Sequence, residues 1–206
     1  MEEKKKKIIL YGIAIILSLT LFIIIIHFLQ VKDYFALLWI CYITLVLILV
    51  GIIRKDSNLI LSQIIILLIP STIWIIDFII STVNPKNLEI PIVFFNVGSF
   101  SQAILSILHI YTIIFALIAL ALLKIEKKSY KALLIGFIEI GIVFLLMILI
   151  PGNYGVNCLP TPVYCMVSIT LPGFIPYPLF LLFSVSVFIM ISYFVILSIP
   201  VFRKII

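Results

Sequence analysis

Six long apolar stretches, separated by short polar breaks, constrain what this chain can fold into. Each has more than 20 residues, enough for a helix to cross a bilayer core of about 30 Å. Since helices satisfy their own backbone polar groups in hydrocarbon, the sequence predicts an all-α polytopic membrane protein with a six-transmembrane-helix bundle. The predicted helices cover about residues 8–29, 33–53, 58–82, 99–123, 130–150 and 174–200.

The composition agrees with a chain that uses lipid as its solvent. Hydrophobic residues make up 65% of the chain and charged residues 11%, whereas soluble domains carry roughly 25% charged residues. We find no linker, internal repeat or low-complexity tract, so residues 1–206 are predicted to form a single membrane domain. The net charge of +6 does not predict nucleic-acid binding, because the basic residues follow the pattern of membrane topology.

The basic residues divide unevenly between the two sides of the predicted bundle. With six spans, twelve of the fourteen lie on the side of the N-terminus, and Lys32 and Lys86 lie on the other side. This split predicts a multi-pass protein of the cell membrane with both termini cytoplasmic, and a retained signal anchor at the basic N-terminus. The twelve are Lys4, Lys5, Lys6, Lys7, Arg54, Lys55, Lys124, Lys127, Lys128, Lys131, Arg203 and Lys204.

Two predicted outer loops, residues 83–98 and 151–173, differ in composition from the short inner ones. The second is rich in proline and glycine and has no charged residue, which predicts a cap over the mouth of the bundle or a functional lid. Cys158 and Cys165 lie in this loop, seven residues apart, and are a candidate disulfide. A redox pair is the less favoured alternative, because the Cys-x-x-Cys spacing is absent.

Two of the predicted helices carry polar residues at helical spacing, and lipid cannot hydrogen-bond such a stripe. We therefore expect these two helices to form the centre of the bundle. The stripe of the third helix is Gln63, Pro70, Trp74, Asp77 and Ser81, and that of the fourth is Ser99, Gln102, Ser106, His109 and Thr112.

Four ionisable groups lie within the predicted spans. Counted from the outer boundary, His27 and Asp77 fall in a shallow layer, and His109 and Glu139 near mid-bilayer. A charge at mid-bilayer costs at least about 2.5 kcal/mol, so we expect Glu139 to be paired or protonated. Asp77, near a helix C-terminus, is expected to contact His27, an outer lysine or the second stripe. For His27 and Glu139 alone, a structural role is favoured.

A nucleophile can be sought at the same depth as His109. Thr44 lies about level with it and Cys41 one turn nearer the outside, so either could form a nucleophile–base pair with the histidine. Equal depth permits this contact and does not require it. No metal site or cofactor is predicted, because the sequence has no metal-ligand cluster and no phosphate loop.

Three segments, Pro70–Phe78, Leu105–Ile110 and Tyr154–Pro162, resemble a pattern in uncharacterised prokaryotic six-span proteins. More distantly, the layout is similar to the YwaF-like and androgen-induced-protein-like integral membrane families. Some members of the latter are intramembrane threonine hydrolases that act on lipid esters, with the threonine in an early helix and a histidine in the fourth. The resemblance implies that His109 and Thr44 would be catalytic.

Three functional hypotheses follow. The first is an intramembrane hydrolase or acyltransferase, with His109, Thr44 and Asp77 as catalytic residues and an apolar substrate that enters from membrane lipid. Its pocket would be lined by Cys41, Trp74, Gln102, Ser106 and Glu139. The second is a transporter of protons or small solutes, whose conduit should continue to the cytoplasmic side. The inner halves of the two striped helices are nearly bare of polar residues apart from Ser62 and Gln63, which favours a pocket open outward or sideways over a through-path. The third is a non-catalytic membrane subunit.

Overall fold

The computed structural model describes residues 3–31, 40–83, 100–125, 129–149 and 177–202, and within these ranges it leaves out the side chains of residues 31, 73–83, 100–109, 147–149 and 177–181. The predicted all-α class is confirmed, because the described ranges hold six α-helices, one short 3-10 helix and no strand. The elements are α1 (Glu3–Val31), α2 (Ile40–Arg54), α3 (Ser57–Val83), α4 (Phe100–Leu123), α5 (Tyr130–Leu149), α6 (Tyr177–Ser198) and η4 (Pro200–Phe202).

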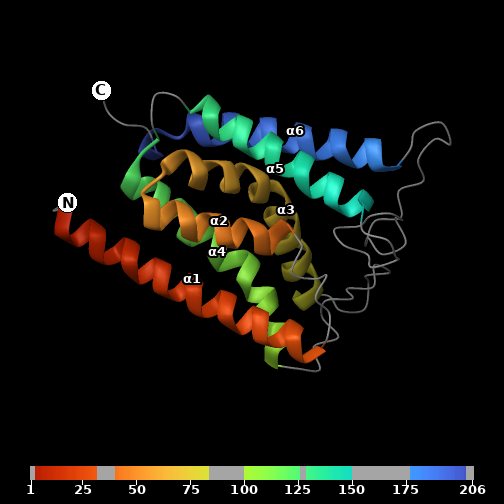
Figure 1. Cartoon of the computed structure of the whole chain (residues 1–206), viewed down its shortest axis with the longest axis horizontal. Helices are drawn as coiled ribbons and strands as arrows, with labels where there is room; N and C mark the ends of the chain where they lie inside the picture. Colours follow the sequence, from red (N-terminus) through yellow and green to blue (C-terminus); the bar gives the residue numbers. More distant parts are fainter. Residues whose placement is uncertain (1–2, 32–39, 84–99, 126–128, 150–176, 203–206) are drawn as a thin grey trace.

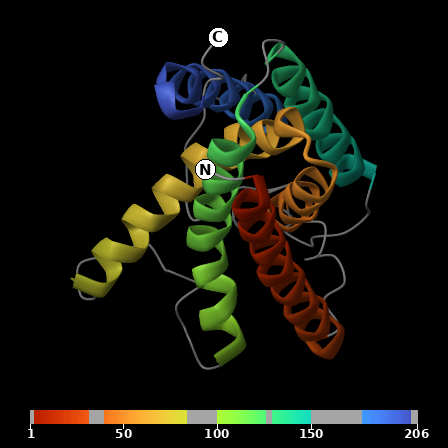
Figure 2. The same ribbon diagram turned by 90° about the vertical axis from the view of Figure 1, so that its left-hand side faces the viewer.

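Helix α3 is the central helix of the bundle. It packs against α2, α4, α5 and α6, whereas α1 packs against α2 and α4. Figure 1 shows α1 along one edge of the molecule and α5 with α6 along the opposite edge, and Figure 2 shows the same arrangement from the side. Of the described helices, α3 is thus the one that packs against the most others.

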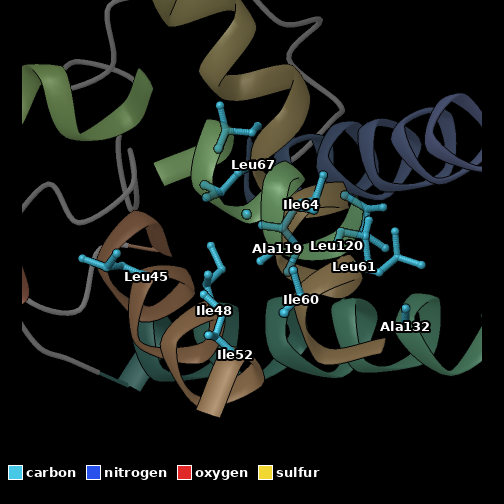
Figure 3. Close-up of a cluster of buried hydrophobic side chains, with 14 of the residues drawn as sticks. Leu45, Ile48, Ile52, Ile60, Leu61, Ile64, Leu67, Ala119, Leu120 and Ala132 are labelled. Atoms are coloured by element: carbon cyan, nitrogen blue, oxygen red, sulfur yellow. The ribbon is translucent and has the colours of Figure 1, made fainter. Parts of the chain in front are cut away.

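The hydrophobic core is built around this first half of α3. The eight residues from Ile60 to Leu67 are all buried, on every side of the helix, and six of them have no exposed surface. Figure 3 shows how side chains from three other helices close around them. These are Leu45, Ile48 and Ile52 of α2, Ala119 and Leu120 of α4, and Ala132 of α5.

Helix α3 bends about midway along its length (Figure 1). Pro70 lies inside the helix, where its ring removes one backbone hydrogen bond and clashes with the preceding turn, which is the usual cause of such a bend. The bend separates residues that a straight helix would align. Gln63 is fully buried whereas Pro70, seven residues later, is exposed, so these two members of the predicted stripe do not share one buried face.

A tight turn joins α2 to α3. The Asp56 amide donates to the Gly51 carbonyl (2.8 Å) and the Lys55 amide to the Ile52 carbonyl (3.2 Å), which is the Schellman pattern of helix ends. Lys55 occupies the left-handed position of this motif, with φ 54°. Asp56 then caps α3, because its Oδ1 accepts from the amides of Asn58 (3.0 Å) and Leu59 (3.1 Å).

Replacing Lys55 by glycine is expected to stabilise the protein. A residue with a Cβ pays about 1–2 kcal/mol for the left-handed conformation, and glycine adopts it without that cost but loses more backbone entropy on folding. We expect a net gain of about 0.5–1 kcal/mol, measured as a higher midpoint of thermal unfolding in neutral detergent. Lys7→Gly, at an exposed helical position, is the matched control and should lower the midpoint. A lower midpoint for Lys55→Gly would contradict the strained turn.

The described basic residues gather at one end of the bundle. Figure 1 shows that the start of α1, the α2–α3 turn, the end of α4, the start of α5 and η4 all lie at this end. Two contacts join η4 to the end of α4, since Lys124 Nζ donates to the Val201 carbonyl (2.5 Å) and the Ile125 amide to the Phe202 carbonyl (2.8 Å). This basic end carries Lys4, Lys5, Lys6, Lys7, Arg54, Lys55, Lys124 and Lys131.

Helix α1 is long and apolar enough, by length and composition, to cross a membrane, and it is the one described helix that meets this test. A signal sequence near an N-terminus, or the core helix of a soluble protein, would meet it as well. Of its most apolar part, 33% is buried, whereas a core helix would be mostly buried. Where only residues with described side chains are counted, shorter apolar helical segments cover Ile40–Arg54, Ser57–Thr72, Ile110–Leu123 and Leu182–Ser198.

Candidate functional site: a buried carboxyl–carboxamide pair

A polar contact crosses the core between α3 and α5. Gln63 Nε2 donates a hydrogen bond of 2.7 Å to Glu139 Oε2, between residues that are 76 positions apart in the sequence. Gln63 has no exposed surface and Glu139 is 8% exposed. Both residues lie within apolar stretches, so this contact places a carboxyl group inside a hydrophobic bundle. The sequence identifies each residue as polar but does not pair them.

The pair is only half satisfied. Gln63 Oε1 and Glu139 Oε1 are both buried and have no hydrogen-bond partner among the described residues. A buried acceptor that makes no bond costs about 1–3 kcal/mol, so each of these two oxygens would gain from a hydrogen-bond donor. One more hydrogen-bond donor between the two side chains could therefore bond to these oxygens.

The surroundings of the pair supply a hydroxyl and a close helix contact. Gln63 Nε2 also donates to Ser62 Oγ (2.9 Å), and Ser62 in turn donates to the Leu59 carbonyl (2.7 Å). Gly136, one turn before Glu139, faces Ile65 across the helix contact, where an added Cβ would lie 3.5 Å from the Ile65 Cδ1. An added Cβ at that distance would make an ordinary van der Waals contact, so α5 contacts α3 beside the pair without requiring a glycine.

Thr44 is buried in α2, but its hydroxyl is bonded to its own helix. Its Oγ1 donates to the Cys41 carbonyl (2.9 Å), in the way that threonines in helices commonly satisfy themselves. Cys41 is a half-buried free thiol on the same helix. No contact of either side chain with a basic group is described. The side chain of His109 is outside the description, so its predicted contact with Thr44 or Cys41 stays a prediction.

The other predicted site residues fall where side chains are not described. Trp74 and Asp77 lie in α3, and Gln102, Ser106 and His109 lie in α4, and the side chains of these helix segments are outside the description. Cys158 and Cys165 lie outside the described residues altogether. The catalytic roles of His109 and Asp77, and the disulfide, thus stay predictions. Within the described ranges, no three His, Cys, Asp or Glu side chains form a group that could hold a metal.

A second polar contact joins α1 to α4. Tyr111 Oη donates to Thr20 Oγ1 (2.7 Å), and Thr20 donates to the Ile16 carbonyl (2.9 Å). Neither residue was expected to matter from the sequence, although Tyr111 lies two positions after His109. On α1, His27 is half-buried and its ring meets Phe28 edge-on at 5.2 Å between centroids. The Tyr111–Thr20 bond joins two helices, and the ring contact lies between neighbouring residues of α1, so both are structural contacts.

Comparison with protein families, with functionally curated proteins and with solved structures gives no match for this chain. The resemblance to the YwaF-like and androgen-induced-protein-like families stays a prediction on its three sequence segments. The functional argument accordingly depends on the residues themselves.

Proposed function

We propose that the chain is a multi-pass membrane protein that binds and releases a proton at Glu139 and couples this proton to the movement of a small solute. The observation that carries the proposal is the buried contact between Glu139 and Gln63, in which one oxygen on each side chain lacks a partner. The membrane location and the proton site are supported by different observations.

The outer surface of the bundle supports the membrane location. Large apolar side chains are exposed along five helices, α1, α2, α4, α5 and α6, and soluble proteins rarely expose contiguous apolar patches of more than a few hundred Å². Lipid is the solvent that makes such a surface favourable. Among the exposed side chains are Ile15, Leu19 and Phe22 of α1, Ile114 and Ile118 of α4, Leu134, Ile138 and Ile142 of α5, and Phe183, Ile191 and Phe194 of α6.

Six spans with both termini cytoplasmic are the proposed topology, and cysteine labelling in cells tests it. With Cys158 and Cys165 changed to serine, an introduced Gln30→Cys is expected to react with an impermeant maleimide from outside. Lys131→Cys is expected to react only after the cells are opened, because the basic end faces the cytoplasm. Both positions are exposed, which makes them a matched pair. Labelling of Lys131→Cys in intact cells would contradict the topology.

Protonation of Glu139 changes what the pair can do. An ionised carboxylate only accepts hydrogen bonds, whereas a protonated carboxyl also offers one donor. With a proton on Oε1, Glu139 can donate to Gln63 Oε1 while Gln63 Nε2 donates to Oε2, so that two bonds join α5 to α3 in place of one. Helix α6, which also packs against α5, has no acidic, basic or histidine residue between Tyr177 and Ser198 that could supply a counter-charge.

Binding of a proton to Glu139 can therefore shift the packing of α5 against α3. A ligand moves a two-state equilibrium only when it binds one state better than the other, and the second hydrogen bond is such a difference. The polar side chains of α3 also continue from Gln63 through Ser62 to Asn58, toward the basic end. These are the residues that would extend the conduit to the cytoplasmic side. Proton uptake into vesicles that contain the purified protein tests the proposal directly.

The hydrolase hypothesis requires a reactive nucleophile. Activity-based labelling detects such a residue and so distinguishes a hydrolase from a transporter. A fluorophosphonate probe should label the purified protein at Thr44 or Cys41, and the labelling should disappear in His109→Ala. The bond from Thr44 to its own helix is the reason that we place proton binding first. A role as a non-catalytic subunit predicts neither labelling nor proton uptake.

A further inference from the structure

We propose that a basic hollow at one end of the bundle binds the phosphate group of an anionic membrane lipid. The hollow has a volume of about 360 Å³ and lies where the α2–α3 turn meets the start of α5. The proposal rests on the membrane location proposed above, but not on the proton site. Its lining residues are Arg54, Lys55, Asp56, Asn58, Lys131 and Ile135.

The hollow has an excess of positive charge. It brings together three basic side chains and one carboxylate, and no ion pair joins Arg54, Lys55 or Lys131 to a described carboxylate. The carboxylate of Asp56 is already engaged, because its Oδ1 accepts from the amides of Asn58 and Leu59. Three like charges around one hollow repel each other, and an anion among them would remove that cost.

The turn holds these charges in place. The two hydrogen bonds of the Schellman motif fix the backbone at Lys55, and the Asp56 cap fixes the start of α3. Arg54 precedes this turn, and its guanidinium can bind phosphate through two parallel hydrogen bonds. Lys131 comes from α5, so the hollow is closed by elements that are far apart in the sequence. The backbone that carries the three basic side chains is thus held in helices and a capped turn, unlike a flexible basic tail.

The surface around the hollow favours a lipid over a free phosphate compound. Ile53, which precedes Arg54, is 62% exposed, and Leu134 and Ile138 of α5 are 57% and 53% exposed. These side chains form apolar surface on both elements that line the hollow. A ligand with a phosphate and acyl chains would bind both surfaces. Basic pockets between helices at the cytoplasmic side are known to bind anionic headgroups for the same reason.

Native mass spectrometry of the purified protein, with phosphatidylglycerol or phosphatidylcholine added in neutral detergent, tests this proposal. The protein is expected to retain phosphatidylglycerol in preference to phosphatidylcholine. The double variant Arg54→Gln/Lys131→Gln should bind phosphatidylglycerol roughly thirtyfold more weakly, about fivefold for each basic residue. Lys4→Gln/Lys7→Gln removes the same charge from α1 and should change the affinity by less than about threefold.

Three outcomes would overturn the proposal. The first is an equal loss in the two double variants, which would mean that the net charge alone attracts the lipid. The second is equal retention of the two lipids by the wild type. The third is displacement of phosphatidylglycerol by millimolar inorganic phosphate, which would assign the hollow to a free anion. Arg54→Lys keeps the charge and should lose only part of the affinity, which separates loss of binding from loss of folding. Recovery of the protein in the soluble fraction would instead overturn the membrane location.

Discussion

Replacing Glu139 by glutamine is expected to abolish proton uptake by the purified protein in vesicles. Glutamine has nearly the shape of glutamate, and its amide can still exchange hydrogen bonds with Gln63, so the contact between α5 and α3 is kept. The variant has no group at this position that can gain or lose a proton. Uptake is measured with a pH-sensitive dye inside vesicles after an external acid pulse.

Two further variants make this result specific. Glu3→Gln removes a carboxyl from an exposed position at the start of α1 and should leave proton uptake unchanged. Gln63→Leu removes the donor to Glu139 Oε2 and should reduce uptake and destabilise the protein by about 1 kcal/mol, the order measured for polar contacts between membrane helices. Wild-type rates in a folded Glu139→Gln variant would show that the proton passes elsewhere or does not pass at all.

Replacing Gly51 by alanine is expected to destabilise the protein by about 1–3 kcal/mol. A Cβ at this position would lie 2.7 Å from Ile60 Cγ1 and 3.3 Å from the Ile60 backbone nitrogen. A change of rotamer at Ile60 could move Cγ1 away, but the Ile60 backbone nitrogen would stay closer than an ordinary van der Waals contact, so the clash would be relieved only in part. The loss is measured as a lower unfolding midpoint in neutral detergent.

Alanine at two other helical glycines gives the control for this effect. Gly12 and Gly141 have nothing within 4 Å of the position of an added Cβ, and alanine favours helix by up to about 1 kcal/mol over glycine. These variants should be neutral or more stable. Combining Gly51→Ala with Ile60→Ala removes Cγ1, so the double variant should lose less than the sum of the two single losses. Additive losses would contradict the proposed close contact.

The helical class could be predicted from the sequence because long apolar stretches allow little else. The central position of α3 could be predicted only in part. Its polar residues indicated a buried helix, but the burial of Ile60–Leu67 on every side depends on four neighbouring helices. The stripe from Gln63 to Pro70 assumed a straight helix. The helix bends about midway along its length (Figure 1), and Gln63 is buried whereas Pro70 is exposed.

Counting residues from the end of each helix predicts the depth of a side chain in the membrane but not its partner. Counting residues put Glu139 level with His109 and Thr44, and it is Gln63 that bonds to the carboxyl. Depth is set by position along each helix, whereas partners are set by which helices are neighbours and which faces meet. Packing of α3 against α5 is a tertiary feature that spacing within one helix does not encode. The bond between Tyr111 and Thr20 was missed for the same reason.

Infrared difference spectroscopy of the protein in lipid, titrated with acid, tests the central claim most directly. A protonated carboxyl gives a carbonyl band that is separate from those of carboxylates and amides. The account predicts that one component of the carbonyl band that grows reversibly as the pH falls, and that shifts in deuterated water, is missing in Glu139→Gln but present in Glu3→Gln. An identical titration in the wild type and Glu139→Gln would contradict a proton site at Glu139.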